Sequence, residues 1–196
     1  MTANQLMLRQ GVASTTYEEI KVASGVSKSQ LYFHFPDKDL LVEAVVRARA
    51  ALVIAREERQ LGRLNSIRGL ERWRDALVQT NAADNSTFGC GIGALASELA
   101  DRDDEAREVL QETFVRWQGL IETGLERMRE AGRLRKEADP RKLSVGLLAA
   151  LQGGYLLAQA ARDSEPMKVA LDMAIDHVRG FATERPAPAK KRTKSG

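Results

Sequence analysis

The amino-acid sequence predicts an all-α fold, in which a small N-terminal helix-turn-helix unit precedes a larger helical domain. Aromatic residues make up only 5% of the 196 residues, whereas Ala, Leu, Arg and Glu are abundant, and this composition favours helix. Apolar residues recur at intervals of three and four, and no segment alternates as a strand would. Residues 11–41 add a close series of helix start and stop signals.

Two short helices are predicted before Gly25. Gly11 ends the first, since glycine is the usual residue after a helix C-terminus. Thr16 and Glu19 have the spacing of a capping box, in which each side chain bonds to the backbone N–H of the other residue. The second helix therefore begins at Thr16, turns Ile20 inward and ends at Gly25.

A third helix is predicted from Ser27, whose hydroxyl can cap it. Leu31 and Phe35 are four residues apart and share its inward face, and Phe35 is expected to fill the small core. Pro36 stops this helix and Asp37 caps the next one. A helix that follows such a turn is the element that small DNA-binding proteins place in the major groove.

The order and spacing of these residues resemble the DNA-binding domain of the TetR family of bacterial regulators. The resemblance runs through residues 15–41, so it is much more specific than an isolated short motif. The residues that carry it are Thr15, Thr16, Ile20, Gly25, Val26, Ser27, Lys28, Leu31, Tyr32, His34, Phe35, Lys38, Asp39 and Leu41.

The resemblance implies a set of contacts to DNA around the third helix. Thr16 and Lys38 would bind phosphates at helix N-termini. The side chains that would face the major groove or its walls are Ser27, Lys28, Ser29, Gln30, Tyr32, Phe33 and His34. Gln30 is the best candidate for reading a base, because its amide can pair with adenine, and Lys28 could read guanine or hold a phosphate.

The sequence departs from the family pattern at three places. Lys21 and Ser24 stand where alanines are usual, and Lys21 is expected to extend outward along its helix. The segment before Gly11 has ten residues, which is shorter than the usual first helix of the family. Either the natural start lies upstream, or the first helix is clipped and the protein holds DNA more weakly.

The chain is expected to have three parts: a helix-turn-helix domain over residues 1–42, a helical regulatory and dimerisation domain over 43–183, and a disordered basic tail over 184–196. Further helices are predicted over residues 37–60, 66–83, 94–100, 103–131, 140–162 and 165–182. The first of these joins the two domains in the family and could transmit a movement between them. Its apolar spacing predicts burial of Leu40, Leu41, Ala44, Val45, Ala48 and Leu52.

The last two predicted helices are rich in apolar and small residues, which allow close helix packing. In the family they pair with their copies in a four-helix dimer interface. A two-fold dimer would place two recognition helices on a near-palindromic operator of double-stranded DNA. The alternative is that these helices only complete the core of a monomer.

The middle helices enclose an effector cavity in the family. The side chains expected to line it are Trp73, Phe88, Cys90, Phe114, Trp117 and Tyr155. Such an aromatic, mostly apolar lining would suit a small lipophilic or planar molecule, although each residue could equally belong to the core. Cys90 lies near a predicted helix N-terminus, where a thiol can become reactive, but an inert buried cysteine is the simpler interpretation.

The charge and the hydropathy of the chain limit the classes of function that it can have. Residues 185–196 carry five basic residues and no acid in a chain of net charge +3, so the rest of the chain carries −2. High basicity is therefore a property of the tail, which either aids solubility or adds salt-dependent attraction to DNA. A single cysteine excludes an internal disulfide and suits the cytoplasm, and no apolar run near 20 residues is apparent.

The leading hypothesis is a dimeric DNA-binding repressor that a small effector releases from its operator. The alternatives are a redox or electrophile sensor acting through Cys90, a constitutive DNA-binding dimer, and a small helical enzyme. The enzyme is disfavoured because His34 and His177 are far apart and no paired-cysteine or His-Glu metal spacing occurs. No cofactor or metal is expected, and no membrane partner.

Overall fold

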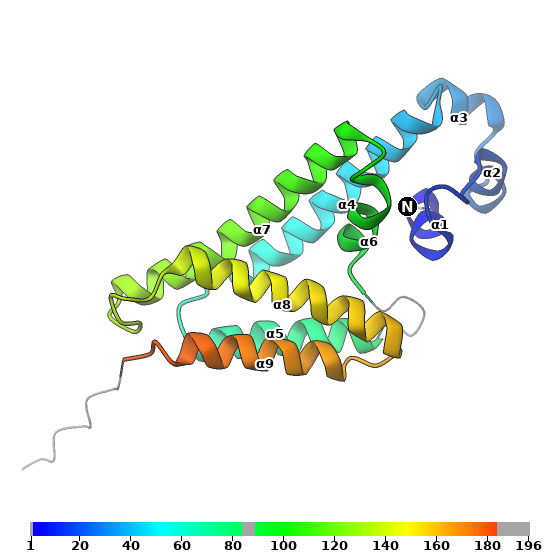
Figure 1. Ribbon diagram of the computed structural model, residues 1–196. Coiled ribbons are helices and arrows are strands. Elements are labelled where there is room, and N and C mark those ends of the chain that lie inside the picture. Colours follow the sequence, from blue (N-terminus) through cyan, green and yellow to red (C-terminus); the bar gives the residue numbers. More distant parts are fainter. Residues whose placement is uncertain (1, 84–88, 184–196) are drawn as a thin grey trace, which may run out of the picture.

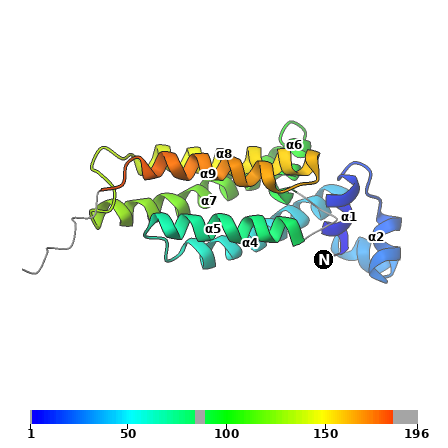
Figure 2. The same ribbon diagram turned by 90° about the horizontal axis from the view of Figure 1, so that it is seen from below.

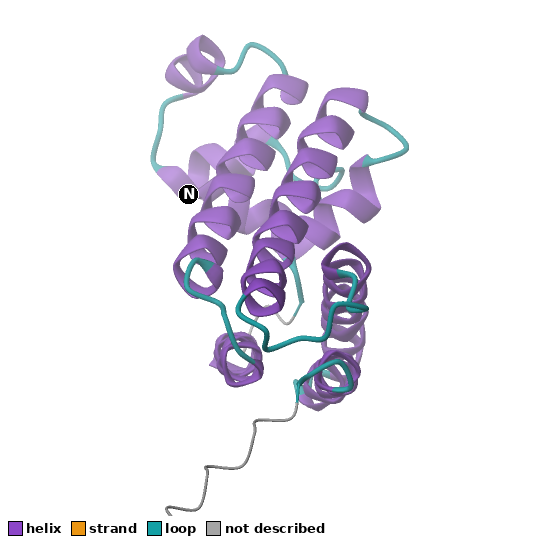
Figure 3. Ribbon diagram, turned by 90° about the vertical axis from the view of Figure 1, so that its left-hand side faces the viewer, coloured by secondary structure: helices purple, strands orange, loops and turns teal. Residues whose placement is uncertain are grey.

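The computed structural model describes residues 2–83 and 89–183, which form nine α-helices (Figure 1). In chain order these are α1 (Thr2–Gln10), α2 (Tyr17–Ser24), α3 (Lys28–His34), α4 (Lys38–Leu61), α5 (Ile67–Ala83), α6 (Gly91–Leu99), α7 (Asp104–Glu130), α8 (Pro140–Ala161) and α9 (Glu165–Arg179). The described residues contain no strand, apart from one isolated bridge between Leu134 and Ala182 (Figure 3). The predicted all-α fold is confirmed.

The predicted helix starts are confirmed by the capping geometry. Thr16, Ser27, Asp37 and Asp139 each accept a hydrogen bond, through the side chain, from a backbone N–H in the following first turn. These bonds satisfy donors that a helix N-terminus leaves without partners. The capping box at Thr16 forms as predicted, and Ser27 forms a second capping box with Gln30.

The first three helices pack around a small apolar core with the N-terminal part of α4. Ile20 of α2 and Leu31 of α3 are buried, as predicted, together with Met7 of α1. Phe35 is only half-buried and packs at the edge of this core rather than filling it. The centre of the core is occupied by aliphatic side chains instead, so the expectation for Phe35 was too strong.

The predicted buried face of α4 is partly wrong. Leu41 and Val45 are buried, but Leu40 is 44% exposed, Leu52 is 56% exposed and Ala48 is also exposed. The buried side chains are instead Leu41, Val42, Val45, Val46, Val53, Ile54, Glu57 and Leu61. Two neighbouring stripes of α4 both have helical spacing, and the helices that pack against it determine which one is buried.

The larger domain is built from two groups of crossing helices. The long helices α4 and α7 lie side by side, α8 packs on α7, and α9 packs between α8 and α5 (Figures 1 and 2). Close approach of α8 to α9 depends on Gly154, because a Cβ there would lie 2.8 Å from the Cα of Met167. A methyl group at this position would push directly against the neighbouring backbone.

Helix α8 corrects the expectation about membrane spans. It is the one helix among the described residues that is long and apolar enough to cross a bilayer, judged by length and composition alone. In the folded chain Leu143, Leu147 and Leu151 of α8 are buried against neighbouring helices. Val145, Leu156 and Leu157 on the rest of α8 are exposed, and 44% of its apolar window is buried in the single chain.

The chain after α9 is tied to the segment between α7 and α8. The N–H of Arg135 donates to the carbonyl of Phe181 at 2.8 Å, and the N–H of Thr183 donates to the carbonyl of Arg133 at 3.1 Å. These bonds hold Thr183 at the end of the molecule opposite α2 and α3 (Figures 1 and 2). The predicted tail lies outside the described residues.

Candidate DNA-binding surface and regulatory core

The turn between α2 and α3 is fixed by local hydrogen bonds. Gly25 has φ of +71°, a left-handed conformation that glycine adopts without strain, and its N–H donates to the carbonyl of Lys21 at 2.9 Å. Ser24 accepts a hydrogen bond from the N–H of Val26 at 3.3 Å. The serine that departs from the family pattern therefore helps to hold the turn.

The outward face of α3 matches the sequence prediction. Lys28, Ser29, Gln30, Tyr32, Phe33 and His34 are all exposed, together with the cap residue Ser27. Phe33 is 82% exposed, which is a large apolar surface for a ring on a soluble helix. All of these side chains reach the surface of the N-terminal domain.

Tyr32 is held between two other side chains. Its ring stacks on Tyr17 with 4.8 Å between the ring centroids, and the Nζ of Lys28 lies 5.7 Å from its centroid. The hydroxyl of Tyr17 lies within hydrogen-bond distance of the carbonyl oxygens of Phe35 (2.9 Å) and Asp37 (2.5 Å). Burial and the nearby Asp37 raise the pKa of Tyr17, which keeps its hydroxyl protonated.

Sequence reasoning missed this role of Tyr17. Its backbone partners lie 18 and 20 residues further along the chain, so no local spacing reveals them. Tyr17 joins the start of α2 to the junction between α3 and α4, and thereby fixes the support on which Tyr32 rests.

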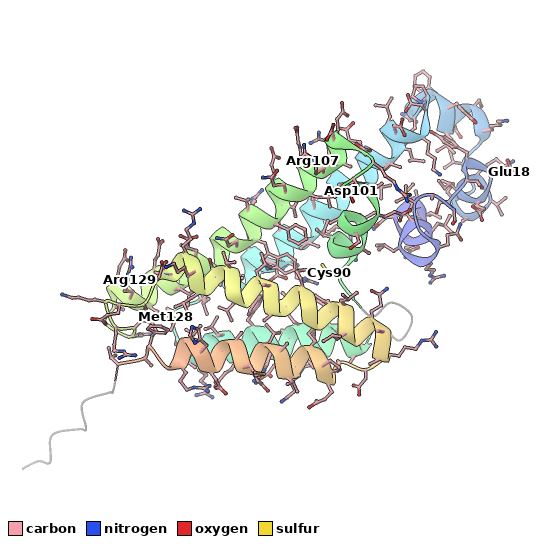
Figure 4. The ribbon with its side chains drawn as sticks, in the orientation of Figure 1. Glu18, Cys90, Asp101, Arg107, Met128 and Arg129 are labelled. Carbon is pink, nitrogen blue, oxygen red and sulfur yellow. The ribbon has the colours of Figure 1, made fainter. Side chains whose placement is uncertain are left out.

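A surface hollow of about 400 Å³ lies where α2, α3 and the start of α4 meet. It is lined by Thr15, Thr16, Tyr17, Glu18, Lys21, Lys28, Leu31, Tyr32 and Lys38. The two residues predicted to bind phosphates, Thr16 and Lys38, therefore share one hollow with Tyr32. Figure 4 labels Glu18, which belongs to the same lining. Lys38 also donates to the carbonyl of Ala13 at 3.1 Å.

The structure changes what is expected of Gln30. Its Oε1 accepts hydrogen bonds from the backbone N–H of Ser27 at 3.2 Å and from the Ser27 hydroxyl at 3.0 Å. Bidentate pairing with adenine needs both ends of the amide. Gln30 would have to release the capping box of α3 before it could read a base in this way.

A carboxylate of the larger domain holds the turn between α1 and α2. Glu98 of α6 accepts hydrogen bonds from the N–H of Val12 at 2.9 Å and from the N–H of Ala13 at 2.8 Å. Gly11, with φ of +86°, lets the chain pass close to this carboxylate. No local pattern predicts this contact, because its partners are more than 80 residues apart in the chain.

The interior of the larger domain contains an ion pair. Glu57 of α4 is fully buried and accepts hydrogen bonds from the Nε of Arg56 at 2.7 Å and from the indole N–H of Trp73 at 2.8 Å. The guanidinium of Arg56 lies 5.9 Å from the ring centroid of Trp117. Burial opposes the charge of Arg56, but Tyr155 and Glu57 raise its pKa above the ordinary value.

Cys90 and Tyr155 adjoin this ion pair. The Sγ of Cys90 caps α6 by accepting a hydrogen bond from the N–H of Gly93 at 3.4 Å, and the thiol is half-buried beside α8 (Figure 4). Burial raises the pKa of Tyr155 far above its ordinary value, so its phenol stays neutral. The charge of Arg56 acts in the opposite direction and lowers the pKa of Tyr155, but burial has the larger effect.

The structure describes five of the six residues predicted to line an effector cavity. Trp73, Trp117 and Tyr155 are buried near the ion pair, and Cys90 lies at its edge. Phe114 is partly buried and lines a surface hollow of about 340 Å³ with Ala96, Leu110 and Leu148. Phe88 lies outside the described residues.

Within residues 2–83 and 89–183, no three His, Cys, Asp or Glu side chains are close enough to hold a metal ion.

Two models of known protein families match this chain. Residues 2–45 match the model for bacterial regulatory proteins of the tetR family, and residues 66–173 match the C-terminal domain of LmrA/YxaF-like transcriptional regulators. The chain belongs to the TetR family. It is thus a DNA-binding transcriptional regulator and not a member of an enzyme family.

Relatives of this TetR-family chain match it over most of their length. The HTH-type transcriptional regulator LmrA of Bacillus subtilis is 26% identical over 167 residues, which cover 84% of this chain and 86% of LmrA. The uncharacterized regulator YxaF of the same organism is 24% identical, with 85% of each chain covered.

Solved structures share the fold of this TetR-family chain. The reduced form of Escherichia coli NemR has a TM-score of 0.81 and 22% identity, and covers 95% of both chains. The regulatory protein TetR from Rhodobacter sphaeroides has a TM-score of 0.80 and 21% identity, and covers 89% of this chain and 94% of its own.

Proposed function

We propose that this protein is a cytoplasmic, dimeric repressor that leaves a near-palindromic operator when a small effector binds. The observation that carries the proposal is the outward face of α3, which stands exposed beside the hollow that contains Thr16 and Lys38. Residues 1–42 act as the DNA-binding domain, residues 43–183 as the regulatory and dimerisation domain, and residues 184–196 as a basic tail. Helix α4 crosses the boundary between the two domains without a break.

A homodimer through α8 and α9 is supported by apolar side chains that the single chain leaves uncovered. Leu156 and Leu157 on α8 and Val169 and Met173 on α9 are exposed. A hollow of about 290 Å³ between the same helices is lined by Lys142, Leu143, Gly146, Leu147, Ala174 and His177. Small and apolar residues on two adjacent helices suit packing against a second helix pair.

The effector site of this proposal is the interior cluster around Trp73, Trp117, Tyr155 and Cys90. Its aromatic side chains suit a planar or lipophilic molecule, as the sequence predicted. The buried indole N–H of Trp117 has no hydrogen-bond partner among the described residues. An effector with an acceptor atom would satisfy this donor, and the cost of leaving it unpaired favours binding.

The DNA-binding proposal is tested with duplexes that the wild-type protein selects from a random pool. The double variant Tyr32→Ala, Lys38→Ala should lose specific binding to the selected duplex, because it removes one groove-facing ring and one phosphate ligand. Light scattering should show the same oligomer as the wild type. Unchanged affinity in fluorescence anisotropy would refute the assignment of this surface.

A second candidate mechanism is electrophile sensing through Cys90. The observation in its favour is that the thiol itself caps α6, so alkylation or oxidation would remove that cap. The reduced NemR structure has the same fold, which supports the comparison at the level of fold alone. If Cys90→Ser keeps the wild-type response to an electrophile such as N-ethylmaleimide, this mechanism is wrong. One DNA affinity across effectors and electrophiles would instead indicate a constitutive dimer.

A further inference from the structure

Three lysines from three different helices line the hollow beside α3. Lys21 comes from α2, Lys28 from α3 and Lys38 from α4, and Glu18 is the single acidic residue in the lining. The lining therefore has an excess of positive charge, although the folded part of the chain has none overall. Such a local excess attracts an anion.

The present partners of these lysines can be exchanged. Lys21 forms an ion pair with Glu18 one turn earlier in α2, and the Glu18 side chain is 65% exposed. An exposed ion pair of this kind contributes little to stability, so a second anion can compete for the lysine. Lys38 donates to a neutral carbonyl oxygen, and Lys28 lies near the ring of Tyr32.

The neighbouring groups favour a phosphate over a base edge. Thr16 and Tyr17, at the start of α2, belong to the same lining, and the partial positive charge of the helix N-terminus adds to that of the lysines. Of the exposed side chains of α3, the hollow is lined by Lys28 and Tyr32 and not by Ser29, Gln30, Phe33 or His34. When α3 enters the major groove, this wall of the domain meets the DNA backbone.

We propose that Lys21 binds a DNA backbone phosphate together with Lys28 and Lys38. This inference rests on the proposed DNA-binding function and adds a phosphate ligand at a position where the family usually has alanine. Lys21 thereby adds affinity for DNA that an alanine at this position would not supply. It contributes to binding of every sequence equally, because a phosphate carries no sequence information.

The experiment compares the salt dependence of DNA binding between wild-type protein and Lys21→Ala. Each phosphate contact contributes about −0.9 to the slope of log affinity against log salt. The variant's slope should be less steep by about 0.9 for one contact and about 1.8 for two contacts in a dimer. Between 50 and 200 mM salt, the ratio of wild-type to variant affinity should fall by about 3.5-fold or 12-fold respectively.

Three further variants act as controls. Lys136→Ala removes an exposed lysine from the segment between α7 and α8, at the other end of the molecule, and should leave the slope unchanged. Lys21→Arg keeps the charge and should restore the wild-type slope. Glu18→Gln removes the competing carboxylate and should increase affinity at low salt. Circular dichroism checks that each variant is folded.

The possible results separate this inference from the proposed function. A reduced slope with unchanged sequence preference supports phosphate binding by Lys21. A wild-type slope in Lys21→Ala, with specific binding retained, overturns the role of Lys21 and leaves the proposed function intact. A changed sequence preference overturns the phosphate assignment, because it would show that Lys21 reads bases. If the wild-type protein selects no sequence at all, the proposed function fails and this inference fails with it.

Discussion

Replacing Glu98 by alanine tests the contact between α6 and the turn that follows α1. The carboxylate accepts hydrogen bonds from the N–H groups of Val12 and Ala13 at 2.9 and 2.8 Å. A hydrogen bond to a charged group contributes about 1.5–3 kcal/mol. Because the bond from Ala13 is exposed, we expect the two together to contribute about as much as one buried bond.

Native-state hydrogen exchange measures this contact directly at the two amides. A loss of about 1.5–3 kcal/mol in local protection corresponds to exchange that is about 10- to 140-fold faster. Glu98→Gln keeps the shape of the side chain and one good acceptor, so it should accelerate exchange less. The amide of Gly25, which bonds to Lys21 within the helix-turn-helix unit, supplies an internal reference.

Two outcomes would refute this reasoning. Unchanged exchange at Val12 and Ala13 in Glu98→Ala would show that the carboxylate does not hold the turn. Equal acceleration at Gly25 would show that the substitution loosens the whole N-terminal unit. Only acceleration confined to Val12 and Ala13 agrees with a local link from α6.

Four other substitutions test the packing and charges. Gly154→Ala should lower the free energy of unfolding by about 1–3 kcal/mol, because the new methyl group meets Met167. Gly153→Ala has open space around the new methyl group and should raise the free energy of unfolding by up to about 1 kcal/mol. Chemical denaturation that gave both changes the same sign would contradict this. Arg56→Ala should cost about 3 kcal/mol by leaving buried Glu57 without its counter-charge, and a melting temperature equal to that of the wild type would be the contrary result. The Glu19 carboxyl accepts hydrogen bonds from Thr16, and these bonds lower the pKa of Glu19 below 4.5. The stability that the Glu19 carboxylate adds is therefore present above pH 4.5 and is lost as the pH falls through the lowered pKa. The stability difference between wild type and Glu19→Gln should therefore shrink below pH 4.5, and a constant difference would argue against the capping role.

Local signals predicted the helix-turn-helix unit well, because the groups involved are neighbours in the chain. The cap at Thr16, the turn at Gly25 and the outward position of Tyr32 each depend on residues within a few positions. A capping hydroxyl needs only the N–H three residues later, so its spacing is visible in the sequence.

The face of α4 could not be predicted with the same accuracy. Leu40 and Leu52 have helical spacing, and so do Val42, Val46 and Val53, yet only the valines are buried. Spacing identifies a possible apolar face but not the helix that will cover it. The position of α7 and α6 along α4 decides between the two stripes, and that position depends on contacts distant in sequence.

Polar contacts between distant segments were missed for a related reason. Glu98 and Glu57 look like ordinary surface residues of amphipathic helices. Glu98 accepts hydrogen bonds from the turn after α1, and Glu57 accepts one from Trp73 of α5 besides that from its neighbour Arg56. Tyr17 likewise gives no local sign that its hydroxyl will reach the start of α4. Aromatic residues such as Trp117 could be assigned to the interior from the sequence, but not to one side of a helix or the other.

The backbone pairing of residues 133–135 with residues 181–183 also decides how the protein can be handled. It fixes Thr183 at the end of the molecule opposite α3. A fluorophore or surface tether joined beyond this point begins its course on the side away from α3. Attachment after Thr183 is therefore the better way to immobilise the chain for binding measurements, whereas a fusion before α1 would begin in the domain that carries α3.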